Sequence, residues 1–204
     1  MRKQILEEGK SYTFSDYFEL SNPTKEIVAE FGYQFQFKKI DLPKYPLQGS
    51  LDKLKNTFYK KLPHISLNSE TAKREVLVAP VLLELLDFLE IEIDIEYPLN
   101  VSSQLKGNVD YLIRSSGNLV VIEAKKADLE RGFSQLSVEM IAVDHYLEEI
   151  DAPIYGAVTV GDLWRFGVLD RKEKLISKDI DSYRVPSDLE ELFSVLMGIL
   201  KPSE

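Results

Sequence analysis

The chain has 204 residues, of which 44% are hydrophobic and 29% are charged, the proportions of an ordinary globular protein with a sizeable core. It contains no cysteine and only two histidines, which excludes disulfides, thiolate chemistry and a multi-histidine zinc centre. The net charge of −9 argues against a general nucleic-acid binder, although the first third of the chain is basic on balance.

Residues 1–68 predict an α+β elaboration that precedes the main domain. A short helix is expected over residues 25–31, because the preceding Asn-Pro-Thr is typical of a helix start. Residues 33–37 alternate aromatic and polar side chains, which is the period of a half-buried strand. Residues 51–61 predict a basic amphipathic helix.

Residues 69–204 predict an α/β core built on a central mixed β-sheet. A helix capped by Ser69 runs to about residue 90, and Pro80 should kink it or mark its true start. Three strands follow, at about residues 91–98, 109–114 and 118–125. Asp128 can then cap a long helix that runs to about residue 149. A hairpin of residues 154–160 and 163–169 and a final helix over about residues 187–200 complete the order. This order predicts a mixed sheet flanked by helices.

The hairpin formed by the second and third of these strands is the most informative segment. If its turn is centred between Ser116 and Gly117, Asp110 lies directly opposite Glu123. Facing residues of an antiparallel pair project to the same side, with Cβ atoms roughly 4.5–5.5 Å apart. Lys125 projects to that side as well, because it lies two residues past Glu123. Unless the register slips by one residue, the hairpin gathers two carboxylates and one ammonium group.

Such a cluster is suited to metal-dependent hydrolysis of a phosphodiester. Two adjacent carboxylates raise each other's pKa unless a cation is present, and a divalent metal supplies that cation. A lysine alongside can orient water and stabilise developing negative charge. With oxygen ligands alone, magnesium, manganese or calcium is favoured. The alternative is an Asp–Lys–Glu salt-bridge cluster on an exposed strand edge, since charged strand faces are common.

The arrangement D…E-x-K on consecutive strands resembles the core of the PD-(D/E)XK phosphodiesterase superfamily. Further segments match, in order, the nuclease domain of type I restriction subunits and related stand-alone proteins. They are a helix with an acid followed by an arginine, a strand ending in an acid, a helix with a glutamine motif, and a hairpin with a tryptophan; here these are Glu70-Thr-Ala-Lys-Arg74, Ile95-Glu96-Tyr-Pro98, Gln135-Leu-Ser-Val-Glu139 and Thr159–Phe166. The resemblance covers about half of the chain.

The resemblance implies a restriction-endonuclease-like fold and a role for each motif residue. Asp110 and Glu123 would be metal ligands, and Lys125 would be the catalytic lysine. Glu70 would complete the metal shell from its helix, with Glu75 as the rival position; either acid is otherwise a surface residue of that helix.

In this resemblance, Gln135 on the long helix is the glutamine of the glutamine motif. Its side chain would face the site and touch the substrate or orient Lys125, unless it is a polar residue at the edge of the core. Two positions depart from the family pattern: Val109 replaces the motif proline, and Glu139 stands where the glutamine motif often has tyrosine. No ATPase or helicase motor is present, so this chain alone would not perform restriction by translocation.

The leading hypothesis is a Mg²⁺- or Mn²⁺-dependent nuclease that acts on DNA. A second hypothesis is a catalytically silent member of the same fold that serves as a binding or assembly module. A third is an unrelated α/β protein whose strand charges are merely solvated. Because an acidic protein grips DNA weakly, a homodimer or a partner protein is expected to supply DNA affinity. No apolar run is long enough to cross a bilayer and no secretory signal is present, so a cytoplasmic location is expected.

Overall fold

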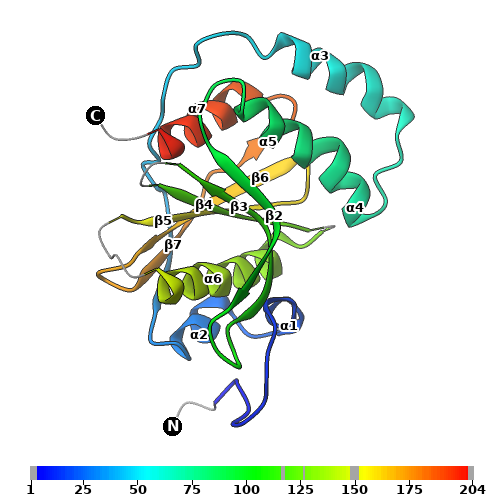
Figure 1. Ribbon diagram of the computed structural model, residues 1–204. Coiled ribbons are helices and arrows are strands. Elements are labelled where there is room, and N and C mark those ends of the chain that lie inside the picture. The colour runs from blue at the N-terminus through cyan, green and yellow to red at the C-terminus, as the bar shows by residue number, and fades with distance from the viewer. Residues whose placement is uncertain (1–3, 116–117, 126, 148–151, 202–204) are drawn as a thin grey trace.

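The computed structural model describes residues 4–115, 118–125, 127–147 and 152–201. These residues form one mixed eight-stranded sheet between two layers of helices (Figure 1). The strands follow one another across the sheet in the order β1 (Gln34–Lys38), β7 (Leu175–Asp179), β6 (Leu163–Asp170), β5 (Ile154–Thr159), β4 (Leu119–Ala124), β3 (Lys106–Arg114) and β2 (Glu92–Asn100), and β8 (Tyr183–Arg184) pairs with β6. The predicted α/β class with a central mixed sheet is confirmed.

Two strand pairs are parallel, β1 with β7 and β4 with β5. The chain passes from β4 to β5 through α6 (Leu129–Tyr146), which forms a βαβ unit. All other neighbouring strands are antiparallel. Helix α6 begins directly after Asp128, whose carboxylate accepts a hydrogen bond from the backbone N–H of Arg131 at 3.0 Å, so the predicted cap is confirmed.

Each face of the sheet has its own hydrophobic core. Helices α1 (Phe14–Glu19), α2 (Thr24–Ala29) and α6 cover one face, while α3 (Asp52–Lys61), α5 (Ala79–Leu85) and α7 (Leu189–Leu200) cover the other (Figure 1). Strand β4 shows how the two sides are divided, because Val121 belongs to the first core and Ile122 to the second. Glu123 alternates back to the α6 side, where a charged side chain lies inside the core.

The predicted helix after Ser69 consists of three consecutive segments. The chain forms α4 (Glu70–Lys73), one π-helical turn over Arg74–Val78 and then α5. Pro80 lies in the first turn of α5, so it marks the start of that segment, as one of the two expectations held. The Ser69 hydroxyl accepts a hydrogen bond from the backbone N–H of Ala72, which confirms the predicted cap.

The hairpin of β3 and β4 has the predicted register. Tyr111 pairs with Ile122 and Arg114 with Leu119, while the predicted turn at residues 116–117 lies outside the described residues. The backbone ladder ends at the Tyr111–Ile122 pair. Asp110 is the next residue of β3, and here its side-chain carboxylate, instead of its backbone, accepts a hydrogen bond from the backbone of β4.

The N-terminal segment is built into the same sheet and into both cores. Strand β1 extends the sheet beyond β7, α1 and α2 pack on α6, and α3 packs on α5. A boundary was expected at residue 69, but the segments before and after it share one sheet, because β1 belongs to the same sheet as the later strands. Within the described ranges, no helix combines the length and the apolar character that a membrane crossing needs.

Candidate active site at the open end of the β3–β4 hairpin

The two hairpin carboxylates meet where β3 and β4 separate. Asp110 Oδ2 accepts a hydrogen bond of 2.9 Å from the backbone N–H of Ala124, which fixes the Asp110 side chain against the end of β4. The Asp110 side chain is 15% exposed, whereas Glu123 is 1% exposed. These carboxylates are therefore buried or nearly so, which argues against a solvated cluster on a strand edge.

Lys125 forms an ion pair with Glu123. Its Nζ atom lies 2.6 Å from Glu123 Oε1 and 5.1 Å from the centroid of the Phe18 ring. The backbone N–H of Lys125 donates to the carbonyl of Thr159 at 2.8 Å, which anchors the residue beside β5. Gly132 on α6 leaves the space for this side chain, because a Cβ atom there would lie 3.2 Å from Lys125 Cγ and 2.8 Å from Val158 Cγ2.

Glu123 shares its buried surroundings with Glu139 of α6. Burial, followed by the charges of Glu139 and Asp110, raises the pKa of the Glu123 carboxyl well above its ordinary value, against the opposing effect of Lys125. Burial likewise raises the pKa of Glu139 to about 7, although the hydrogen bond from Gln135 and the proximity of Glu123 oppose the shift. Neither Glu123 oxygen has a well-directed hydrogen bond, and Glu139 Oε2 has none. The buried carboxylates of Glu123 and Glu139 are thus short of hydrogen-bond donors.

Arg74 joins the cluster from the π-helical turn. Its Nη1 atom lies 3.3 Å from Asp110 Oδ1 and 3.4 Å from Glu96 Oε1, and its guanidinium carbon lies 5.4 Å from the centroid of the Tyr111 ring. Burial raises the pKa of Asp110, while the Ala124 hydrogen bond and the Arg74 charge lower it. Glu96 has a φ of 53°, an uncommon conformation for a non-glycine residue, at the β2 position opposite Asp110.

A cavity of about 430 Å³ opens beside Lys125. Glu70, at the start of α4, lines it together with Lys125 and with Asp128 at the start of α6. Glu70 also acts electrostatically on the buried groups, since its charge raises the pKa of both Asp110 and Lys125. The rival acid Glu75 is not part of the cavity wall, so the structure brings Glu70 to the cluster from this helix.

Gln135 is buried within α6 and faces the cluster. Its Nε2 atom donates to Glu139 Oε1 at 2.9 Å, so its connection to Lys125 runs through Glu139 and Glu123. Glu139 and Arg74 are the two members that sequence reasoning did not assign to the site. Glu139 carried a signal, because it lies four residues after Gln135 and residues at this spacing share one helix face.

The oxygen ligands of the cluster are not arranged as a ready metal centre. Across the ranges that the structure describes, no group of three or more Asp, Glu and His side chains is arranged to hold a metal ion. Asp110 instead pairs with Arg74, and Glu123 with Lys125. The buried Glu123 oxygens that lack a well-directed hydrogen bond nevertheless fit a cation ligand in chemical character.

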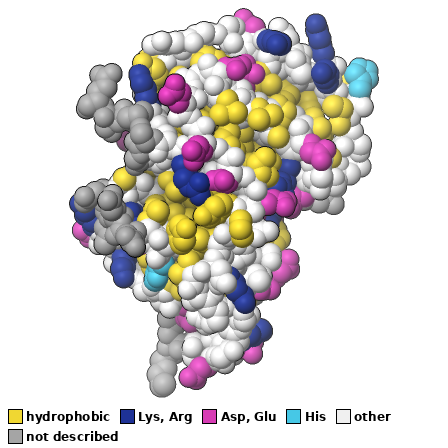
Figure 2. Space-filling view, in the orientation of Figure 1, with side chains coloured by type: hydrophobic (Ala, Val, Ile, Leu, Met, Phe, Trp, Pro, Cys, Tyr) yellow, Lys and Arg dark blue, Asp and Glu magenta, His cyan; other side chains and the backbone are white. Residues whose placement is uncertain are grey.

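The surface around the molecule offers no broad basic area on the side that Figure 2 shows. Lys and Arg side chains are scattered among acidic and hydrophobic ones on this face. Because the whole chain carries a net charge of −9, a polyanion would have to rely on local cations rather than on the overall field. No family model, curated protein or solved structure matches this chain.

Proposed function

We propose that this protein is a metal-dependent nuclease of the PD-(D/E)XK type, with a restriction-endonuclease-like fold and DNA as its substrate. One observation carries the proposal. The open end of one hairpin brings together Asp110, Glu123 and Lys125, which are largely shielded from water. Glu70 approaches them from the start of α4. Buried clusters of carboxylates with perturbed pKa values are uncommon outside functional sites, because their burial destabilises the fold.

Asp110 and Glu123, with Glu70 beside them, are the residues that would hold a Mg²⁺ or Mn²⁺ ion. A bound divalent ion of this kind polarises a phosphodiester and lowers the pKa of a water molecule. The donor set supports this assignment, since oxygen ligands suit both metals and the Glu123 carboxylate is short of hydrogen-bond donors.

Lys125 would act directly on the substrate. Its ammonium group lines the cavity and is held in place by Glu123, by the ring of Phe18 and by its backbone bond to Thr159. From that position it would hold an attacking water or stabilise the negative charge that develops on a phosphate. Gln135 would be a positioning residue, because its amide holds Glu139 next to Glu123.

The acidic composition bears on how the substrate is bound. With a net charge of −9, the protein alone should bind DNA weakly at physiological salt. A homodimer or a partner protein would then supply the DNA affinity that cleavage of both strands requires.

A catalytically silent binding or assembly module is the second candidate, and a specific observation favours it. Arg74 already neutralises Asp110, and Lys125 already neutralises Glu123. A cluster compensated by its own cations needs no metal, so it is compatible with a purely structural role.

Cleavage assays distinguish the two candidates. Plasmid and linear DNA are incubated with Mn²⁺ or Mg²⁺ and with wild type, Glu123→Gln, Asp110→Asn or Lys125→Ala, with exposed Glu173→Gln as the matched loss of one charge. We expect metal-dependent cleavage by wild type and by Glu173→Gln, and a rate at least about a hundredfold lower in the site variants. Thermal melts establish that each variant is folded.

Calorimetry with Mn²⁺ on the same preparations completes the design. Absence of both cleavage and Mn²⁺ binding in folded wild type would refute the nuclease proposal and favour the silent module. Cleavage that persists in folded Glu123→Gln would place the chemistry elsewhere.

A further inference from the structure

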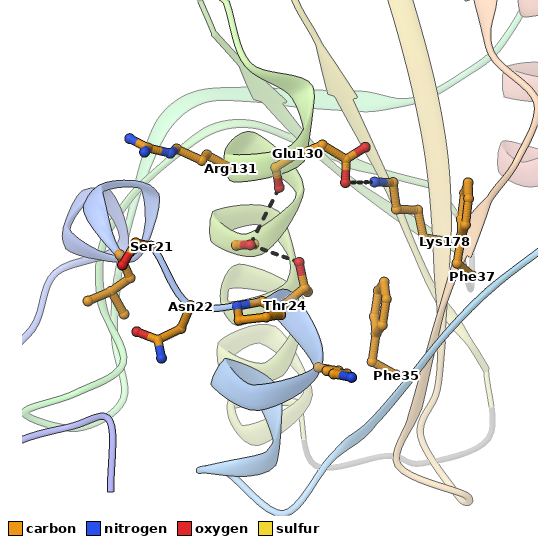
Figure 3. A pocket seen from close by; sticks show the side chains of 12 residues that line it. Ser21, Asn22, Thr24, Phe35, Phe37, Glu130, Arg131 and Lys178 are labelled. Atoms are coloured by element: carbon orange, nitrogen blue, oxygen red, sulfur yellow. Dashed lines mark hydrogen bonds and ion pairs between the residues drawn. The ribbon is translucent and has the colours of Figure 1, made fainter. Parts of the chain in front are cut away.

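A second cavity, of about 420 Å³, is shown in Figure 3, and it shares the start of α6 with the cavity of the candidate active site. Both cavities are lined by the start of α6, since Asp128 borders the first, and Glu130 and Arg131 border the second. The remaining wall comes from α2 and the loop before it, from β1 and from β7. Its volume falls in the range of small-molecule binding sites, roughly 300–1,000 Å³.

Lys178 of β7 supplies a buried cation in this second cavity. Its side chain is 4% exposed, and Nζ lies 5.3 Å from the centroids of both the Phe37 and the Phe133 rings. It forms an ion pair with Glu130, whose side chain is 71% exposed and also contacts Arg165 Nη1 at 3.2 Å. Because Glu130 projects into solvent, its carboxylate can move away and leave the ammonium group to another anion.

Aromatic and polar groups surround this cation. Phe37 is 55% exposed, unusual for so large an apolar side chain, and Figure 3 shows Phe35 and Phe37 beside Lys178. The hydroxyl groups of Thr24 and Ser134 lie 2.8 Å apart on the same wall. The charged side chains of the lining are Lys25, Arg131, Lys178 and Glu130, a positive balance within an acidic protein.

We propose that this second cavity binds one nucleotide unit, with the base against Phe37 and the phosphate at Lys178. An aromatic face next to a buried ammonium group suits a ligand that is both planar and anionic, and base stacking on aromatic side chains tolerates any sequence. The proposal rests on the proposed function where it assigns this nucleotide to the strand that is cleaved beside Lys125. Because both cavities are lined by the start of α6, the second cavity would then hold a nucleotide that flanks the cleavage point.

Fluorescence anisotropy of a labelled 12-residue oligothymidylate tests the proposal, in low salt and with EDTA so that no cleavage occurs. Wild type is compared with Phe37→Ala, Lys178→Met and, as a matched control, Tyr59→Ala, an equally exposed aromatic on α3 outside the cavity. We expect Phe37→Ala and Lys178→Met each to weaken binding about tenfold. Tyr59→Ala should bind like wild type.

Competition with unlabelled dTMP distinguishes the two sources of such a ligand. Displacement at dTMP concentrations near those of the oligonucleotide would assign the cavity to a free nucleotide, and its absence would assign it to a strand. Wild type that binds neither probe, or folded Phe37→Ala and Lys178→Met that bind like wild type, would overturn the proposal.

These experiments separate a failure of the nucleotide site from a failure of the nuclease proposal. Phe37-dependent binding without metal-dependent cleavage would leave the nucleotide site intact and remove only its link to catalysis. Cleavage by wild type, together with unchanged binding in Phe37→Ala, would remove the nucleotide site alone.

Discussion

Two lysines that are largely shielded from solvent, Lys125 and Lys178, flank the start of α6, and they differ in the partners that surround them. Burial lowers the pKa of Lys125, but Glu123, Glu70 and Asp110 together outweigh burial and raise it. Burial also lowers the pKa of Lys178, and there Glu130 offsets it only in part, so the pKa stays below the ordinary value. Lys125 is thus the cation of a carboxylate cluster, whereas Lys178 is a cation set among aromatic rings.

The difference shows that the burial of the partner carboxylate decides whether such a lysine is tied to its ion pair. Glu123 is enclosed with its lysine, so each charge depends on the other. Glu130 is in solvent, where water can stabilise it without the lysine. The first site is locked by its own ion pairs, and the second can exchange its counter-ion.

The largest expected effect comes from removing the Lys125 charge, and the same substitution at Lys178 gives the comparison. Lys125→Met should destabilise the fold by about 3–5 kcal/mol at neutral pH, because it leaves Glu123 buried without its cation. Lys178→Met should change stability by about 1 kcal/mol or less, because Glu130 remains hydrated and the new side chain packs against Phe37 and Phe133. Urea unfolding at pH 7 measures both, and equal losses would break the comparison.

The pH dependence of stability sharpens the description of the carboxylate cluster. The pKa of Glu139 is raised from its ordinary 4.5 to about 7, so the folded state binds protons more tightly than the unfolded state. The stabilisation that Glu139 contributes to the folded state is therefore present at low pH. It is lost as the pH rises from 4.5 through about 7. The pKa values of Glu123 and Asp110 are also raised, so their contributions have the same sign.

We therefore expect the melting temperature to be higher at pH 5 than at pH 8, by on the order of 5 °C. Glu139→Gln should reduce this difference, since its amide never ionises and its oxygen still accepts from Gln135. Exposed Glu173→Gln is the control and should leave the slope unchanged. A wild-type melting temperature that rises with pH would contradict the description of the cluster.

Replacing Arg74 tests whether the protein's own cations or a metal ion neutralise the carboxylates of the cluster. Arg74→Ala removes the ion pair with Asp110, and a loss of about 1–3 kcal/mol is expected because the remaining carboxylate is mostly buried. If Asp110 and Glu123 hold a metal, Mn²⁺ should raise the melting temperature of Arg74→Ala more than that of wild type. Equal shifts, measured by thermal melts with and without Mn²⁺, would favour the silent module.

A smaller effect than those at Lys125 and Arg74 is expected at the start of α6, which both cavities share. Asp128 caps α6 with a φ of 63°, so Asp128→Ala loses the cap and keeps an unfavourable backbone, a cost of about 1–2 kcal/mol. Asp128→Asn keeps the side-chain acceptor and tolerates this conformation, and it should be nearly neutral. Urea unfolding compares the two, and an equal cost would show that the negative charge matters rather than the cap.

Local signals in the sequence were sufficient for much of the fold. The register of β3 and β4 followed from the position of their turn, and the start of α6 followed from its cap. Strand β7 was not predicted, because Ser177, Lys178 and Asp179 are buried polar residues that hide its hydrophobic pattern. Helix α1 was not predicted either, since six residues are too few for a helical period.

The sequence by itself determined the local part of the candidate site. Asp110, Glu123 and Lys125 belong to one hairpin or directly follow it, so strand alternation and a short turn place them on one side. Only the tertiary structure brought Glu70 rather than Glu75 to the cavity, paired Arg74 with Asp110 and enclosed Glu139 beside Glu123. Those contacts depend on how helices pack on the sheet, and packing between distant segments leaves no periodic mark in the sequence.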